Sequence, residues 1–294
     1  MTWDDIWTGD CLELLAKVPA GSVDLAFADP PFNIGYEYDQ YHDRRSKGDY
    51  LAFTDRWLAA VKRTLKPTGS MFVAIGDEYA AEHKVRLDGL GLHLRNWIVW
   101  HYTFGVSCTK KFNRSHAHIF YYVADPKQFT FNADAVRVKS ARQTAYADRR
   151  ANPLGKLPDD TWYLRPQEAD DHFAADSDTW AVSRVCGTFN ERTDHPCQMP
   201  EAVLERVIGV ASNPGDVVLD PFAGSGTTLA VAKRMRRRFL GMELSEAYAK
   251  AVRERLNTVT PEVSEAKRPV RVSVPRGPGM NRSEPAGLRP RKPR

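Results

Sequence analysis

The sequence predicts an α/β protein in which a parallel or mostly parallel β-sheet is covered by helices. Short apolar runs of strand length alternate with longer segments whose apolar residues recur at helical spacing, and this alternation is typical of β-α-β units. Between residues 105 and 193 the pattern weakens, and basic, aromatic and acidic residues are interleaved. A long irregular stretch inside such a pattern indicates an insertion in the fold.

The first part of the alternation precedes this insertion. Residues 23–28 form a short apolar run that Pro30 and Pro31 stop, as expected of a buried strand. Residues 50–66 carry apolar side chains at helical spacing, and the sequence Lys-Pro-Thr-Gly at 66–69 ends that helix. We further expect a strand at 70–75, a helix at 80–90, and strands at 96–101 and 118–124.

The second part begins at Pro200. Apolar residues between 202 and 210 suit a helix, and a turn at 213–216 leads into a strand at 217–219. A helix then opens at Ser225 or Gly226 and continues to Met235. A strand at 239–242 and a final helix, capped by Ser245 and ending near Leu256, complete the unit.

Composition narrows the class of protein. No apolar run approaches the roughly 18 residues of a membrane span, and the first residues do not form a signal peptide, so we expect a cytoplasmic protein with no membrane partner. The four cysteines are widely spaced and predict no metal site. Residues 265–294 hold nine Lys and Arg against two Glu, while the whole chain carries +5. We expect this tail to be disordered, either as a solubilising extension or as a segment attracted to phosphates.

A glycine-rich loop lies between a predicted strand and a predicted helix. Glycines allow a tight turn against a ligand, and the helix N-terminus offers free N–H groups. Thr227 stands where a P-loop needs Lys, and Leu229 where a dinucleotide fold prefers Gly. Glu243, at the end of the next strand, can accept hydrogen bonds from two ribose hydroxyls. The pattern predicts a nucleoside ligand with an amino-acid group instead of a pyrophosphate. The loop residues are Asp220, Pro221, Phe222, Ala223, Gly224, Ser225, Gly226, Thr227 and Thr228.

A second motif, Asp29-Pro30-Pro31-Phe32, follows the first apolar strand. The two prolines fix the backbone and remove two N–H donors, which leaves a carboxylate, rigid carbonyls and an aromatic ring. The Asp29 carboxylate and the Pro30 carbonyl can each accept one N–H of an amino group, and Phe32 can stack on a base. A proline-stopped strand with a capping Asp is the structural alternative.

These motifs, in this order, resemble those of the beta class of amino-directed (N6-adenine and N4-cytosine) DNA methyltransferases. The resemblance covers roughly residues 6–257. It implies a Rossmann-like S-adenosylmethionine-dependent methyltransferase fold, a doubly wound sheet with an inserted target-recognition region. It also implies that the motif at Asp29 holds the base and that the glycine-rich loop holds S-adenosylmethionine.

Two shorter segments extend the resemblance. Residues 9–15 resemble the segment that contacts the cofactor adenine, which implies this role for Asp10 and the backbone of Cys11. His195-Pro-x-Gln198-x-Pro resembles the motif beside the methionine end, with Met199 where many relatives have Lys. The expected cofactor-binding residues are Asp10, Cys11, Asp29, His195, Gln198, Asp220, Phe222, Ala223, Gly224, Ser225, Gly226, Thr227, Thr228 and Glu243, and the expected catalytic residues are Asp29, Pro30, Pro31 and Phe32.

The resemblance implies methyl transfer to the exocyclic amino group of a base flipped out of double-stranded DNA. Asp29 at the first position of its motif favours adenine N6, because Ser is the usual choice of N4-cytosine enzymes, which remain the alternative. Pro196-Cys197-Gln198 resembles a tripeptide of cytosine-C5 enzymes, but it precedes the cofactor loop, and the chain has no Glu-Asn-Val partner. A dehydrogenase or a catalytically silent DNA-binding protein would leave the motif at Asp29 unexplained.

The family organisation implies a catalytic half at 1–104, a target-recognition insertion with at least one core strand at 105–193, a cofactor-binding half at 194–260 and the tail at 261–294. The tyrosines and basic residues of 33–49 leave two alternatives: a segment that closes over the flipped base with its basic residues on phosphate, or an ordinary solvated loop. Two further candidate partners, which the sequence does not decide, are a second copy of the chain and a separately encoded restriction endonuclease. The candidate DNA contacts are Arg44, Arg45, Lys110, Lys111 and Arg114.

Overall fold

The computed structural model describes residues 2–36, 40–41, 43–106, 108–144, 146, 148–163, 180–181 and 198–262. Within these residues, a nine-stranded sheet has the order β1-β9-β8-β2-β3-β5-β4-β6-β7. In chain order the elements are β1 (Asp5–Thr8), α1 (Cys11–Lys17), β2 (Val23–Ala28), α2 (Lys47–Thr64), β3 (Leu65–Ile75), α3 (Ala80–Gly89), β4 (His93–Val106), β5 (Arg114–Val123), α4 (Ala133–Val136), α5 (Ala141–Thr144), β6 (Thr161–Tyr163), β7 (Trp180–Ala181), α7 (Glu201–Ala211), β8 (Val217–Asp220), α8 (Thr227–Arg234), β9 (Arg238–Glu243) and α9 (Glu246–Thr258).

The sheet is parallel except at β5, which runs antiparallel to both of its neighbours, β3 and β4. A short connection joins β4 to β5, and only antiparallel strands can be joined without a long crossover. The other paired strands run in the same direction. The predicted class, α/β with a mostly parallel sheet, is confirmed.

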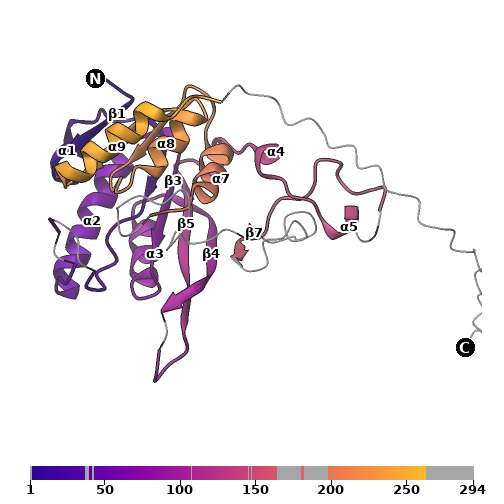
Figure 1. Cartoon of the computed structure of the whole chain (residues 1–294), viewed down its shortest axis with the longest axis horizontal. Coiled ribbons are helices and arrows are strands. Elements are labelled where there is room, and N and C mark those ends of the chain that lie inside the picture. The colour runs from indigo at the N-terminus through magenta and orange to yellow at the C-terminus, as the bar shows by residue number, and fades with distance from the viewer. Residues whose placement is uncertain are drawn as a thin grey trace, which may run out of the picture.

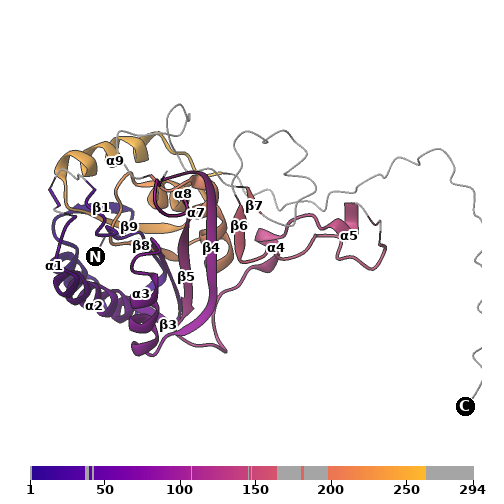
Figure 2. The ribbon, with the colours of Figure 1, turned by 90° about the horizontal axis from the view of Figure 1, so that it is seen from below.

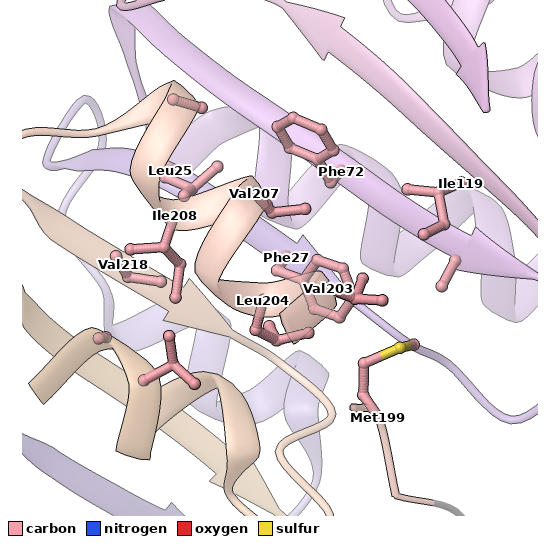
Figure 3. Packing of buried hydrophobic residues seen from close by; sticks show 14 of the residues in the cluster. Leu25, Phe27, Phe72, Ile119, Met199, Val203, Leu204, Val207, Ile208 and Val218 are labelled. Carbon is pink, nitrogen blue, oxygen red and sulfur yellow. The ribbon is translucent and has the colours of Figure 1, made fainter. Parts of the chain in front are cut away.

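Helices cover both faces of the sheet (Figure 2). On one face, α1, α2 and α3 bury a cluster that includes Leu15 and Trp57. On the other, α7, α8 and α9 pack against the sheet. Figure 3 shows α7 lying over the strands, with Val203 and Val207 turned toward Phe27 and Leu25. Because the helices lie on opposite faces, the sheet is doubly wound.

The strand order reverses between β2 and β8. These strands are neighbours, with Leu25 paired to Val218 and Ala26 to Leu219. From β2 the chain continues to β3 on one side, and from β8 to β9 on the other. The carboxyl ends of strands at such a switch point form the usual ligand crevice of open α/β sheets. Asp29 follows β2 and Asp220 ends β8, so both sequence motifs lie at this point.

Some elements differ from the sequence expectations. The pair β1 and α1 was not predicted, since a four-residue edge strand is too short to show periodicity. β3 begins at Leu65 and pairs there with Val23 before a register shift, so residues 65–69 belong to the strand and not to a turn. Residues 124–160 carry α4 and α5 away from the sheet (Figure 1). None of the helices described is long and apolar enough to cross a membrane.

Candidate active site

A cavity of about 630 Å³ lies at the carboxyl ends of β2 and β8. This volume is in the range of small-molecule sites. The cavity brings the two predicted motifs together, although about 190 residues separate them in the chain. The predicted site residues that line it are Asp10, Cys11, Asp29, Pro30, Pro31, Phe32, Gln198, Asp220, Phe222, Ala223, Gly224, Ser225, Thr227, Thr228 and Glu243.

Two predicted cofactor residues are not among those lining the cavity. His195 lies outside the described residues, as do Cys197 and the basic tail. Gly226 packs instead against α9: a Cβ added to it would lie 2.4 Å from a methyl carbon of Val252, and its φ is +74°. Glycine at this position therefore lets α9 approach the loop.

The Glu243 carboxylate is fixed at the end of β9. One of its oxygens accepts the backbone N–H of Gly224 at 3.0 Å, and the other accepts that of Ser245 at 2.9 Å. Each carboxylate oxygen can accept further hydrogen bonds. Glu243 thus ties the glycine-rich loop to the next strand and keeps acceptor capacity for a ligand in the cavity.

Two titratable groups of the cavity have shifted pKa values. Burial, with a smaller contribution from the nearby Glu243, raises the pKa of Asp220 to about 6, while its carboxylate accepts the Phe222 N–H at 2.9 Å. Burial and the adjacent Asp10 raise the pKa of the Cys11 thiol to about 12. Cys11 therefore stays protonated at neutral pH and is unsuited to be a nucleophile.

The motif at Asp29 is supported from two neighbouring elements. The hydroxyl of the buried Tyr50, on α2, donates to the Pro31 carbonyl at 2.9 Å. Phe32 packs over Gly76 at the end of β3, where an added Cβ would lie 3.1 Å from the Phe32 ring. The backbone of this motif, already restricted by its prolines, is thus held by the Tyr50 hydroxyl, and its Phe32 ring packs on Gly76.

The loop after this motif is tied to a single carboxylate. Asp43, 2% exposed, accepts the backbone N–H groups of residues 33–36 at 2.8–3.1 Å. The Asn33 side chain accepts the Arg45 N–H at 2.7 Å and donates to the Arg45 carbonyl at 3.1 Å. Both ends of the loop are thereby closed, and Ile34 and Tyr36 become part of the cavity wall.

The candidate DNA contacts have different environments. Arg45 places its guanidinium 4.8 Å from the ring centres of Tyr41 and Phe53 at the cavity wall. Arg114 forms ion pairs with Asp77, at 2.9 Å, and with Glu78. Arg44, Lys110 and Lys111 are exposed.

Tyr50, Asp43 and Gly76 were not predicted from the sequence. Tyr50 reads as one more apolar residue at helical spacing, and Asp43 as one charge in a polar loop. Their partners become visible only when the chain folds. In the described part of the chain, no cluster of His, Cys, Asp and Glu could hold a metal ion.

Comparisons with known proteins identify relatives of this chain. A family model described as DNA methylase, N6_N4_Mtase, matches residues 23–254. Type II methyltransferase M.HpaI of Haemophilus parainfluenzae is 33% identical over 251 residues, which cover 85% of this chain and 73% of M.HpaI. DNA adenine methyltransferase YhdJ of Escherichia coli K12 is 37% identical over 255 residues, 86% of this chain and 82% of YhdJ. The solved structure of TTHA0409 from Thermus thermophilus, complexed with S-adenosyl-L-methionine, is 26% identical with a TM-score of 0.57 and covers 88% of this chain and 95% of its own.

Proposed function

The chain belongs to the N6_N4_Mtase family of DNA methylases, and we propose that it methylates the N6 amino group of adenine at a specific sequence in double-stranded DNA. As a member of this family it is an S-adenosylmethionine-dependent DNA methyltransferase. The observation that carries the proposal is the cavity at the switch point, which is lined by both the Asp29 motif and the glycine-rich loop. Adenine is supported by Asp at the first motif position and by the activity for which the relative YhdJ is named.

The residues of the cavity fit S-adenosylmethionine, which supplies a methyl group on a positively charged sulfur. The carboxylates of Asp10, Asp29 and Glu243 line the cavity and complement a cationic ligand. We assign the ribose hydroxyls to Glu243, whose position the Gly224 and Ser245 N–H groups fix. Following the family resemblance, Asp10 and the Cys11 backbone would contact the adenine, and His195 and Gln198 the methionine end.

The chain's own residues then position the methyl acceptor. Asp29 and the Pro30 carbonyl each accept one N–H of the target amino group, so that its lone pair points toward the cofactor side of the cavity. The Asp29 carboxylate also stabilises the positive charge that develops on this nitrogen. Phe32 holds the ring plane, and the Tyr50 hydroxyl keeps the Pro31 carbonyl in place. No covalent intermediate with the protein is needed.

The DNA contacts, the segment boundaries and further partners are parts of the same proposal. We assign target recognition to residues 105–193 and phosphate contacts to Lys110 and Lys111, which are exposed on the connection between β4 and β5. Because its proposed substrate is DNA, we assign the protein to the cytoplasm. A cognate restriction endonuclease is supported only by the type II methyltransferases among the relatives, such as M.HpaI. A homodimer remains part of the proposal, and an orphan methylase needs neither.

Mapping the modified base tests the proposal directly. The full chain is expressed in a bacterial host that lacks adenine methylation, and the host DNA is sequenced by a method that detects modified bases. We expect N6-methyladenine in one sequence context, no modification with Asp29→Ala, and full modification with the surface control Glu254→Ala, at an exposed position of α9 outside the cavity lining and outside residues 105–193. Purified Asp29→Ala should still bind S-adenosylmethionine in calorimetry.

Each other outcome rejects a defined part of the proposal. N4-methylcytosine in a fixed context would overturn the choice of base. Methylation by Asp29→Ala would overturn the mechanism, and unmodified DNA with the unaltered chain would overturn the function.

A further inference from the structure

The connection between β4 and β5 carries a large apolar side chain that packs against nothing. Phe112 is 98% exposed. The N–H of Cys108 donates to the Asn113 side chain at 2.9 Å and closes the turn around it. A single exposed apolar residue is common on protein surfaces. Three features distinguish Phe112 from other exposed apolar residues: the position of its hairpin, the ion pairs at the base of the hairpin, and the positive charge at its tip.

The hairpin extends from the wall of the cavity. Trp100 and Tyr102 of β4, and Arg114 and His116 of β5, line it. Because β4 runs in the same direction as β2 and β8, its carboxyl end points to the edge of the sheet where the cavity lies. Figure 1 shows the hairpin projecting beyond the rest of the sheet. A strand advances about 3.3 Å per residue, so Phe112 is within about 7 Å of Arg114 along the chain.

The base of the hairpin is fixed to the cavity rim. Arg114, the first residue of β5, forms ion pairs with Asp77 and Glu78, which follow β3 and Gly76. Gly76 itself lines the cavity. The Arg114 charge is therefore paired with two carboxylates of the same chain. Its two ion pairs connect the base of the hairpin to the segment after β3, where Gly76 contacts Phe32 of the Asp29 motif.

The tip is basic next to the aromatic ring. Lys110 and Lys111 are exposed, and neither has an ion-pair or hydrogen-bond partner among the residues that the structure describes. Two unpaired cations attract a phosphate backbone, and an aromatic ring stacks on bases. The combination suits duplex DNA better than an apolar protein surface.

We propose that Phe112 inserts into the base stack of the bound duplex and takes the place of the flipped target base, with Lys110 and Lys111 on the flanking phosphates. The inference rests on the proposed function, because only an enzyme that extrudes a base leaves such a gap. Extrusion costs the stacking and pairing of the target. An apolar side chain inserted at that step lowers the cost by filling the gap.

The experiment compares two substrates once the modified sequence is mapped. One duplex contains the target base in its normal pair, and the other contains it opposite an abasic position, where it is already poorly held. With the full chain, Phe112→Ala should lower kcat/KM about 10- to 100-fold on the normal duplex, the range expected for one lost stacking contact. On the abasic duplex the loss should shrink to within about threefold, since little extrusion work remains.

Two variants complete the test. Phe112→Trp keeps an aromatic wedge and should retain kcat/KM within about threefold on both duplexes. Val85→Ala removes an apolar side chain that is 69% exposed on α3, outside the cavity lining and outside residues 105–193, and should match the unaltered chain. Equal losses for Phe112→Ala on both duplexes, or no loss on the normal one, would overturn the wedge while leaving the proposed function standing. An unaltered chain that methylates no DNA would overturn both.

Discussion

At the scale of single residues, the acceptor motif depends on a hydroxyl that does not touch the substrate. Tyr50 is buried on α2, and its ring lies 4.6 Å from that of Tyr79. Its hydroxyl donates to the Pro31 carbonyl, one residue beyond the carbonyl assigned to the target amino group. A shift of this backbone would move the Pro30 carbonyl and Phe32 together.

Tyr50→Phe should therefore impair catalysis more than stability. We expect the free energy of unfolding to fall by about 1 kcal/mol, the usual value of one hydrogen bond, and kcat to fall about tenfold or more, because small misplacements are costly at a reacting centre. Affinity for S-adenosylmethionine should stay within about twofold. Urea unfolding, steady-state kinetics and calorimetry measure the three quantities.

The matched control is Tyr122→Phe. Tyr122 is also fully buried, and its hydroxyl donates to Asp88 at 2.7 Å, away from the residues that line the cavity. Its loss should lower stability by a similar amount and leave kcat unchanged. Equal kcat values for the two variants would show that Tyr50 has only a structural role.

The site was predictable from sequence where it consists of short local motifs. Asp29 and Glu243 each follow an apolar strand and needed only the adjacent residues to be noticed. Tyr50 acts on a carbonyl 19 positions away, and Asp43 collects N–H groups 7 to 10 positions away. Such contacts depend on how a loop folds back, and no local pattern reports that.

At the scale of elements, the glycine-rich loop and α9 pack so closely that a side chain at Gly226 would not fit between them. Gly226 has φ +74°, and an added Cβ would overlap the side chain of Val252. Gly226→Ala should lower the free energy of unfolding by about 3 kcal/mol, from left-handed backbone strain and overpacking together. Gly21, with φ +63° and open space at its Cβ position, provides the control. Gly21→Ala should cost only about 1 kcal/mol in the same urea titration; equal costs would contradict the packing argument.

The contact of α3 with α2 makes stability depend on pH. His83 is fully buried between the rings of Tyr50 and Trp57, and burial lowers its pKa to about 4. Its Nε2 has no hydrogen-bond partner in the described part of the chain, so a proton there would be unsatisfied. The unfolded chain binds this proton near pH 6.5 and the folded chain only near pH 4. Stability is therefore fully present above pH 6.5 and falls by about 3 kcal/mol as the pH drops to 4.

His83→Leu should remove this part of the decrease in stability at acid pH. The decrease is measured as the change in the free energy of unfolding between pH 7 and pH 4. The Tyr79 carbonyl that faces His83 Nδ1 still accepts a backbone N–H at 3.0 Å, so the variant leaves no carbonyl unpaired there. His93→Gln, at an exposed position, should leave the change in the free energy of unfolding with pH the same as in the unaltered chain. An unchanged slope in His83→Leu would assign the acid sensitivity to other groups.

The elements that sequence predicted best are those with long periodic patterns. The helix at 50–66 and the helix at 80–90 lie within a few residues of α2 and α3. The reversed direction of β5 could not be predicted, because its apolar run reads the same in either direction and only its neighbours decide. β6, three residues long in the insertion, is a strand by pairing with β4 and β7, and pairing with a distant segment has no local signal.

At the scale of the whole molecule, exposed lysines lie at both edges of the sheet. Lys110 and Lys111 project from the edge where the cavity lies, whereas Lys17 and Lys62 end helices that return to the opposite edge. Each phosphate contact contributes about 0.9 to the slope of log affinity against log salt. The double variant Lys110→Gln/Lys111→Gln should therefore reduce this slope by about 2 for any DNA sequence, measured by fluorescence anisotropy. Lys17→Gln/Lys62→Gln should leave it unchanged; the reverse result would place DNA on the other edge.

The pairing of β2 with β8 also means that the sheet cannot be completed until late in the synthesis of the chain on the ribosome. The Val217 N–H donates to Asp24 at 2.9 Å across 193 positions. At about 5–20 residues per second, roughly 10–40 s of translation separate these two residues. During that interval β2 lacks its neighbour, and its open edge is exposed to chaperones or to other nascent chains. Methyl transfer can begin only after nearly the whole fold has been translated, so incomplete chains from stalled ribosomes would leave the genome unmarked.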